Sequence, residues 1–219
     1  MEETIEILQQ YLLSSLVDTF YMVSVATVIG VLFGTIIGLG LFLTNHEYFY
    51  KQPLINQISG FIVNAIRSLP FLILLVVLLV PITWLIKDPY TPTGGAIALS
   101  IAAIPFYARI AEGAFSEVNA GVIEAAVAAG GNTALIVKDV LIPESLPALI
   151  RGVVLTIISL LGYSAMVGTI GAGGIGDLAI QFGYNRYETG VLIAVIVILV
   201  IIVQLIQWAG DRLANHFVK

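Results

Sequence analysis

The sequence predicts an all-α membrane protein with five transmembrane helices, and three observations point to this class. Of its 219 residues, 59% are hydrophobic and only 11% are charged, whereas soluble domains are about half apolar and about a quarter charged. The apolar residues gather into stretches that match the roughly 20 helical residues needed to cross a bilayer core. The acidic start, MEETIE, lacks the positive region of a signal peptide, so we expect the first apolar span to remain as an anchor.

The first predicted span covers residues 17–43 and carries its one charge, Asp18, at its edge. Glycines at positions 30, 34 and 38 recur every four residues and therefore share one helix face. Such a face lets a neighbouring helix approach closely. Without a close neighbour, the same glycines would only make a lipid-facing helix more flexible, and we favour packing.

The second apolar stretch, residues 56–85, is too long for one perpendicular helix and is interrupted by Arg67-Ser68-Leu69-Pro70. We expect an interfacial or tilted first part, a proline break and a second part over residues 70–85. Three further spans are predicted at residues 94–110, 146–167 and 190–209.

Lysine and arginine, which are enriched on the cytoplasmic side of membrane proteins, predict the orientation. With the N-terminus outside, six of these residues lie on the inner side and two on the outer side. The inner set is Lys51, Arg109, Lys138, Arg151, Arg212 and Lys219, and the outer set is Lys87 and Arg186. We therefore expect the C-terminus inside and the polar segment 109–151 in the cytoplasm.

The polar segment contains a predicted short helix, residues 120–129. Asn119 is a suitable N-cap, Gly130-Gly131 supply a left-handed stop, and Asn132-Thr133 restart a second helix that Pro143 should end. A helix of about ten residues is marginal alone, so it must dock on something. Its own transmembrane helices and a groove on a cytoplasmic partner are both compatible with the spacing.

The same segment resembles the EAA signature of ABC importer permeases, which consists of EAA, three residues, G, nine residues and I-x-L-P. Here Glu124-Ala125-Ala126 and Gly130 match, while Val140 replaces Ile and Ile142 replaces Leu before Pro143. The resemblance implies the type I importer permease fold, with a cytoplasmic coupling helix between the third and fourth spans. That helix would insert into a cleft of a separate ATP-hydrolysing subunit, with Glu124, Ala125, Ala126 and Gly130 as coupling residues.

The stretch LLGYSAMVGTIGAGGIGDLAIQFGYNRY (160–187) resembles methionine-uptake permeases, the small five-helix branch, as do residues 67–71 and 206–212. The resemblance implies a multi-pass cell-membrane homodimer that carries D- or L-methionine or close analogues, with another small amino acid as the alternative. It also implies two copies of an ATPase and an extracytoplasmic substrate-binding protein as partners, besides membrane lipid. The chain would divide into an extracytoplasmic segment (1–16), a permease domain (17–210, coupling loop about 112–145) and a cytoplasmic tail (211–219).

Candidate pore residues flank the interrupted regions of the spans. Tyr163, Ser164 and Met166 precede residues 168–176, which hold five glycines without the Lys-Ser/Thr of a phosphate loop. We expect irregular backbone there, lining a water-filled or protein-buried cavity. Met166 is a candidate outer gate near the dimer axis because its thioether is flexible, an ordinary core methionine being the alternative. Arg67 is a candidate because it is ionisable within a span; snorkelling to headgroups or bonding to helix carbonyls are alternatives.

Several functional classes find little support in the composition. There is no cysteine, and His46 and His216 are far apart, so we expect no metal site. No basic stripe with interleaved aromatics indicates nucleic-acid binding. The chain lacks an ATPase motif, so we expect no enzyme activity and no cofactor, with ATP bound by the partner. A gradient-driven transporter would require paired carboxylates within the spans or inverted repeats, yet Asp18 and Asp211 lie at span ends. An intramembrane enzyme would require His, Asp or Ser pairs on facing helices, and no histidine lies within a predicted span.

Overall fold

The computed structural model describes residues 2–218, which form helices joined by turns and contain no strand. Two residues used in the sequence predictions, Met1 of the N-terminal segment and Lys219 of the inner basic set, lie outside this range. The elements are α1 (Glu2–Asn45), α2 (Pro53–Ser68), α3 (Phe71–Ile86), α4 (Pro92–Ser116), α5 (Ala120–Ala128), α6 (Thr133–Ile136), the π-helical turn η1 (Val137–Leu141), α7 (Ile142–Gly168), α8 (Ile175–Leu178), the π-helical turn η2 (Ala179–Tyr184) and α9 (Thr189–His216).

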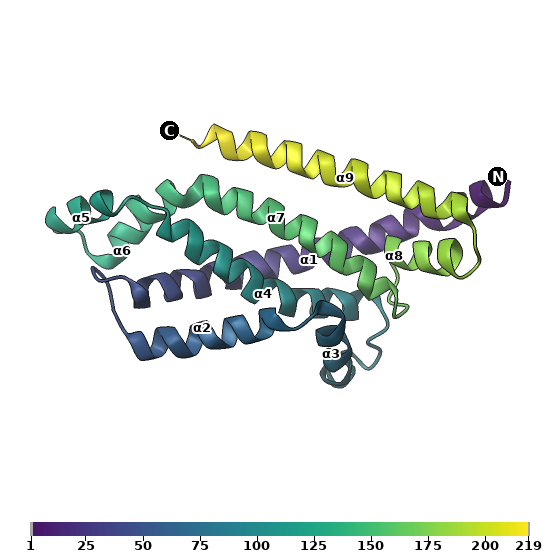
Figure 1. Cartoon of the computed structure of the whole chain (residues 1–219), viewed down its shortest axis with the longest axis horizontal. Helices are drawn as coiled ribbons and strands as arrows, with labels where there is room; N and C mark the ends of the chain where they lie inside the picture. Colours follow the sequence, from purple (N-terminus) through teal and green to yellow (C-terminus); the bar gives the residue numbers. More distant parts are fainter. Residues whose placement is uncertain (1, 219) are drawn as a thin grey trace.

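The helices form an elongated bundle with two distinct ends (Figure 1). Helices α1, α4, α7 and α9 follow the long axis, α2 follows it for part of its length, and α3 turns across it. The short helices α5 and α6 lie toward one end, as does the C-terminus, while the N-terminus and α8 lie toward the other. The predicted cytoplasmic segment and the C-terminus therefore share a side of the molecule.

The number of spans agrees with the sequence prediction at its upper limit. Within the described residues, α1, the continuous stretch Thr133–Gly168, α4 and α9 are each long and apolar enough to cross a membrane. Helices α2 and α3 are bent by 103° relative to each other, and they make a fifth span if the two together are counted as one broken span. Pro70 stands between them as the residue preceding α3, which confirms the predicted proline break.

Glycines of α1 lie in the contact with α4, as their spacing predicted. A Cβ atom added to Gly30 would be 2.5 Å from the Ala103 Cβ, and one added to Gly34 would be 2.9 Å from the Tyr107 Cβ. Gly38 is equally close, with 2.5 Å to the Ala108 carbonyl oxygen. These distances are shorter than any ordinary carbon contact, so the glycines set how closely the two helices approach.

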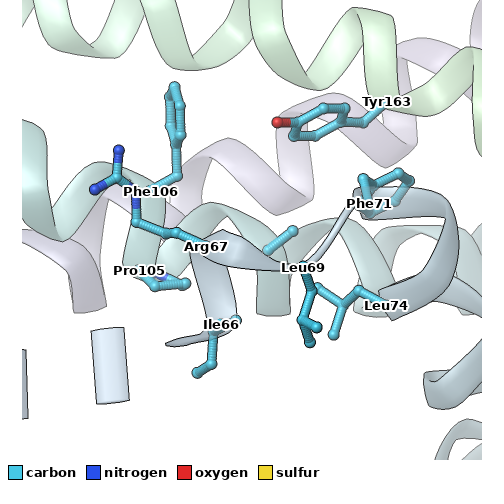
Figure 2. Close-up of a pocket in the computed structure, with 9 residues that line it drawn as sticks. Ile66, Arg67, Leu69, Phe71, Leu74, Pro105, Phe106 and Tyr163 are labelled. Atoms are coloured by element: carbon cyan, nitrogen blue, oxygen red, sulfur yellow. The ribbon is translucent and has the colours of Figure 1, made fainter. Parts of the chain in front are cut away.

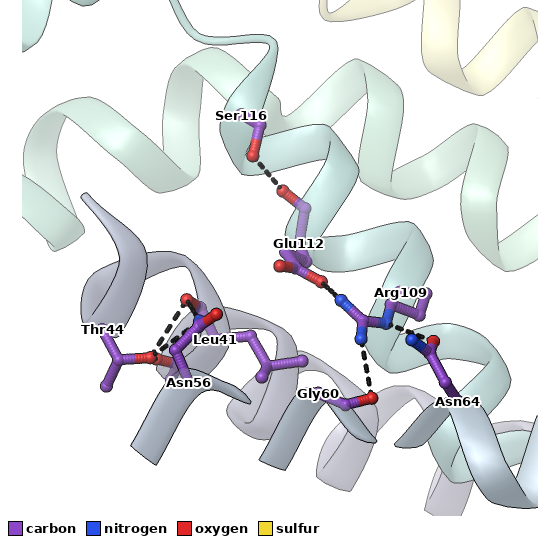
Figure 3. Close-up of polar contacts among 9 residues, drawn as sticks. Leu41, Thr44, Asn56, Gly60, Asn64, Arg109, Glu112 and Ser116 are labelled. Atoms are coloured by element: carbon purple, nitrogen blue, oxygen red, sulfur yellow. Dashed lines mark hydrogen bonds and ion pairs between the residues drawn. The ribbon is translucent and has the colours of Figure 1, made fainter. Parts of the chain in front are cut away.

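Polar contacts hold α2 lengthwise against α1 and α4 (Figure 3). The Arg109 side chain of α4 donates to the Gly60 carbonyl oxygen at 2.8 Å and to the Asn64 Oδ1 at 3.1 Å, and pairs with Glu112 at 2.5 Å. The Asn56 amide donates to the Leu41 carbonyl oxygen of α1 at 2.8 Å. The first part of the second span is therefore a packed member of the bundle.

One sequence prediction about a helix end is corrected by the structure. Helix α1 begins at Glu2 and contains the predicted first span without a break. Pro143 does not end the helix that restarts at Thr133, because the helix continues to Gly168. A proline removes one main-chain donor and crowds the preceding turn. Here the preceding turn is π-helical, with the Ile142 N–H donating to the Val137 carbonyl oxygen, and this wider turn accommodates the proline.

Candidate functional site

Helix α5 is delimited at both ends by the residues the sequence singled out. The Asn119 Oδ1 accepts the Gly121 N–H at 2.8 Å, which caps the first turn. At the other end, the Gly130 N–H donates to the Val127 carbonyl oxygen at 2.9 Å and the Gly131 N–H to that of Ala126 at 3.0 Å. This pair of bonds is a Schellman motif. It requires a left-handed residue, and Gly130 has φ +83°.

Helix α5 attaches to the rest of the chain mainly through one side chain. Ile123 is only 1% exposed and belongs to an apolar cluster with Phe115, Leu141 and Phe42. The predicted coupling residues Glu124, Ala125 and Gly130 are exposed, and Ala126 is half-buried. The intramolecular docking that the sequence allowed is therefore present, and it leaves most of the helix surface open.

The open surface of α5 is largely apolar and small. Val122 and Val127 are exposed large apolar side chains, and Ala125 and Ala128 lie exposed beside them. Leu135 on α6 adds a further exposed apolar side chain. We call Val122, Ala125, Val127, Ala128 and Leu135 the α5 face.

The three candidate residues near the end of α7 face different surroundings. Tyr163 stacks on Phe71 of α3, with ring centroids 4.7 Å apart and planes 11° apart. Ser164 is buried, and its hydroxyl donates to the Leu161 carbonyl oxygen at 2.8 Å, so it has a packing role within this chain. Met166 is 41% exposed within this chain.

The glycine run after α7 forms irregular backbone packed against α1, as predicted for a protein-buried location. Gly171, Gly173 and Gly174 all have positive φ, a conformation that other residues rarely adopt. The buried Ile175 N–H donates to the Thr19 Oγ1 of α1 at 2.8 Å. Sequence reasoning missed the helical segment that follows, Ile175–Tyr184.

Arg67 lies at the end of α2 next to the break before α3. It belongs to the last turn of α2, fourteen positions beyond Pro53 and therefore about 21 Å along the helix. Its guanidinium carbon lies 6.0 Å from the centroid of the Phe106 ring, and it makes no hydrogen bond with another described residue. Arg67 and Tyr163 line one cavity between α2, α3, α4 and α7 (Figure 2).

The candidate residues thus form two separate groups. Glu124, Ala125, Ala126 and Gly130 belong to α5 and its C-terminal turn at one end of the bundle, whereas Arg67 and Tyr163 meet at the α2–α3 break. Among the described residues, no cluster of three or more His, Asp or Glu side chains could hold a metal ion. A helical bundle with several apolar spans and an exposed, capped helix at one end has the architecture of a multi-pass membrane protein.

Comparison with known proteins identifies the class further. Residues 30–218 match the family model described as "Binding-protein-dependent transport system inner membrane component". This chain belongs to that family, and it is therefore a multi-pass membrane protein.

Individual relatives cover nearly the whole chain. The probable D-methionine transport system permease protein MetI of Vibrio cholerae is 41% identical over 94% of this chain and 91% of its own. The methionine import system permease protein MetP of Bacillus subtilis is 43% identical over 80% of this chain and 79% of its own. A solved structure described as "Inward facing conformations of the MetNI methionine ABC transporter" superposes with a TM-score of 0.94 and 36% identity, covering 97% and 98% of the two chains. This chain has the fold of that permease chain.

Proposed function

We propose that this chain is the permease subunit of an ATP-driven importer and that it carries methionine across the cell membrane as a homodimer. The observation that carries the proposal is α5, which presents the EAA residues on an exposed helix held by Ile123 and by caps at both ends. The names of the relatives, which refer to methionine transport, support the substrate. Another small amino acid is the alternative cargo.

ATP hydrolysis belongs to a separate subunit in this proposal, since the chain carries no ATPase motif. Two copies of the ATPase would receive the two α5 faces of the homodimer, and a substrate-binding protein would deliver methionine on the outer side. The N-terminus is outside and the C-terminus inside, with α5 as the coupling helix between the third and fourth spans. The basic residues near α5 and the C-terminus support this orientation.

The division of the chain follows from the same proposal. Residues 1–16 form an extracytoplasmic segment, residues 17–210 the permease domain with its coupling loop at about 112–145, and residues 211–219 a cytoplasmic tail. Helix α1 is 44 residues long, or about 66 Å, so it extends well beyond a hydrocarbon core of about 30 Å. Its acidic first turn, with Glu2 and Glu3, supports a position outside the membrane.

Met166, Tyr163, Ser164 and Arg67 are the proposed pore and gate residues. The exposure of Met166 near the outer end of α7 supports a place at the dimer axis, where its side chain would close the pathway. Tyr163 and Arg67 line the cavity beside that pathway. Ser164 contributes indirectly, because its hydroxyl is hydrogen-bonded to the Leu161 carbonyl oxygen within the last turns of α7.

Reconstitution tests the proposal directly. The chain is co-purified with its ATPase and binding protein in proteoliposomes, and ATP-dependent uptake of labelled L-methionine is measured. Gly130→Asp should abolish uptake because it places a negative charge at the C-terminal end of α5, where the helix dipole is also negative. Gly130→Asn has nearly the same size and tolerates the left-handed backbone at φ +83°, so it should keep part of the uptake. Glu124→Ala should uncouple ATP hydrolysis from uptake while the protein remains folded.

The outcomes separate the candidate functions. Uptake of another amino acid but not methionine would keep the importer and replace the cargo. Uptake driven by an ion gradient without ATP, together with no association with an ATPase, would refute the importer and favour a secondary transporter.

A further inference from the structure

The cavity at the α2–α3 break has features of a binding site for a small molecule. Its volume is about 160 Å³, below the roughly 300 to 1,000 Å³ of drug-sized pockets. It lies where α2 ends at Ser68 and α3 begins at Phe71, so the broken span opens a space that a continuous helix would fill. The remaining walls come from α4 and α7.

The lining combines one cation with three aromatic rings (Figure 2). Phe71 and Tyr163 stack on each other on one side, and Phe106 stands beside Arg67 on the other. Aromatic rings hold apolar side chains and make favourable contacts with thioether sulfur. No residue that lines the cavity is acidic.

Arg67 is the charged residue that lines this cavity, and no described residue forms an ion pair or a hydrogen bond with its side chain. An arginine at membrane depth is costly unless an anion or a polar environment compensates it. The other arginine near α2, Arg109, has its hydrogen bonds satisfied by Gly60, Asn64 and Glu112. Arg67 has no such bonds with the described residues, although its planar guanidinium is suited to holding a carboxylate through two hydrogen bonds.

We infer that this cavity is a binding site within the permease itself for an α-amino acid with a neutral, apolar side chain. Arg67 holds the substrate carboxylate, and Phe71, Phe106 and Tyr163 receive the side chain, including the thioether of methionine. Basic amino acids are disfavoured because Arg67 repels their side chains and no carboxylate in the lining offsets that repulsion. The inference rests on the proposed function, since it places a stopping point of the cargo on the transport pathway.

The absence of cysteine from the sequence makes a local test practical. Ala102→Cys puts a single thiol into the lining of the cavity, and Thr93→Cys puts one on the exposed start of the same helix. Both variants are assembled with the ATPase, without the binding protein, and labelled with a maleimide at increasing L-methionine. Methionine should slow labelling of the cavity cysteine and leave the control cysteine unchanged.

Two further comparisons assign the roles of the groups. L-Methioninol, which has a hydroxymethyl group in place of the carboxylate, and L-lysine should give little protection at concentrations where L-methionine protects fully. Arg67→Gln should raise the methionine concentration for half-maximal protection about 10- to 100-fold, since it removes hydrogen bonds to a charged group. Arg67→Lys should recover part of the loss, and Arg186→Gln, at an exposed arginine stacked on Phe182, should have no effect.

The results distinguish this inference from the proposed function. Unprotected labelling in a preparation that shows ATP-dependent methionine uptake when the binding protein is added would overturn the site and leave the importer standing. Equal protection by methioninol, or full protection in Arg67→Gln, would also overturn the site as described. Protection by methionine without any ATP-dependent uptake would support the site and overturn the transport function.

Discussion

The contact between α1 and α4 yields the most direct test of the fold, through two glycines on one helix. A Cβ atom added at Gly38 would lie 2.5 Å from the Ala108 carbonyl oxygen and 2.8 Å from the Ala111 Cβ. At Gly40, two residues away, an added Cβ meets no described atom within 4 Å. Gly38→Ala and Gly40→Ala are therefore the same change in the same helix with opposite surroundings.

The expected magnitudes follow from these distances. Ordinary contacts begin near 3.4 Å, so alanine at position 38 must push α1 and α4 apart by about 0.9 Å. Overpacking costs about 1 to 3 kcal/mol, and replacing a helical glycine by alanine returns about 0.5 to 1 kcal/mol. Gly38→Ala should therefore destabilise by up to about 2.5 kcal/mol, while Gly40→Ala should stabilise by about 0.5 to 1 kcal/mol.

Thermal unfolding of the purified protein in detergent measures the difference, with the fluorescence of Trp84 and Trp208 as the signal. For a chain of this size about 1 kcal/mol shifts Tm by roughly 2 to 4 °C. We expect Tm to fall for Gly38→Ala by a few degrees and to rise for Gly40→Ala. If both variants shift Tm upward by the same amount, the close approach of α1 and α4 is refuted.

Three further predictions concern other contacts. Thr19→Val removes the acceptor of the Ile175 N–H and should destabilise the protein by about 1 to 3 kcal/mol in the same unfolding assay. Thr19→Ser keeps the acceptor and should not destabilise it, so equal Tm values for the two variants would contradict the hydrogen bond. Arg109→Met removes the contacts to Gly60, Asn64 and Glu112 and should speed hydrogen exchange of the α2 amides about fivefold, for a loss of about 1 kcal/mol. Unchanged exchange in α2, relative to α9 as the internal control, would show that apolar packing alone holds it. Met166→Ala should raise ATP hydrolysis by the assembled transporter when no binding protein is present, and an unchanged rate would count against the gate.

Local features of the fold were predictable because local chemistry decides them. The caps of α5 depend on Asn119 and Gly130, whose preferences act within a few residues. The break at Pro70 follows from the missing donor and the fixed φ of proline. The glycine face of α1 was predictable as well, since its spacing alone placed three small residues on one side.

Features set by residues far apart in the sequence were not predictable. Arg109 and Gly60 are separated by 49 positions, and nothing in the local sequence of either indicates their hydrogen bond. The helical segment after the glycine run is stabilised by Ile175 and Phe182, which pack with Ile7 and Val191 from distant helices. Likewise, Pro143 is tolerated only because η1 precedes it, and a π-helical turn has no simple sequence signal.

The continuity of the stretch Thr133–Gly168 explains how the two candidate groups can act together under the proposed function. Its 36 residues correspond to about 54 Å of helix, running from the turn after α5 to the glycine run. That run is fixed to α1 by the bond between Ile175 and Thr19. Under the proposed function, we expect a displacement of α5 by the ATPase to reach Tyr163 and Met166 along this helix, with the contact to α1 as the fixed point. Since Tyr163 also stacks on Phe71, the same displacement would change the cavity that Arg67 lines and would couple the cytoplasmic partner to the proposed substrate path.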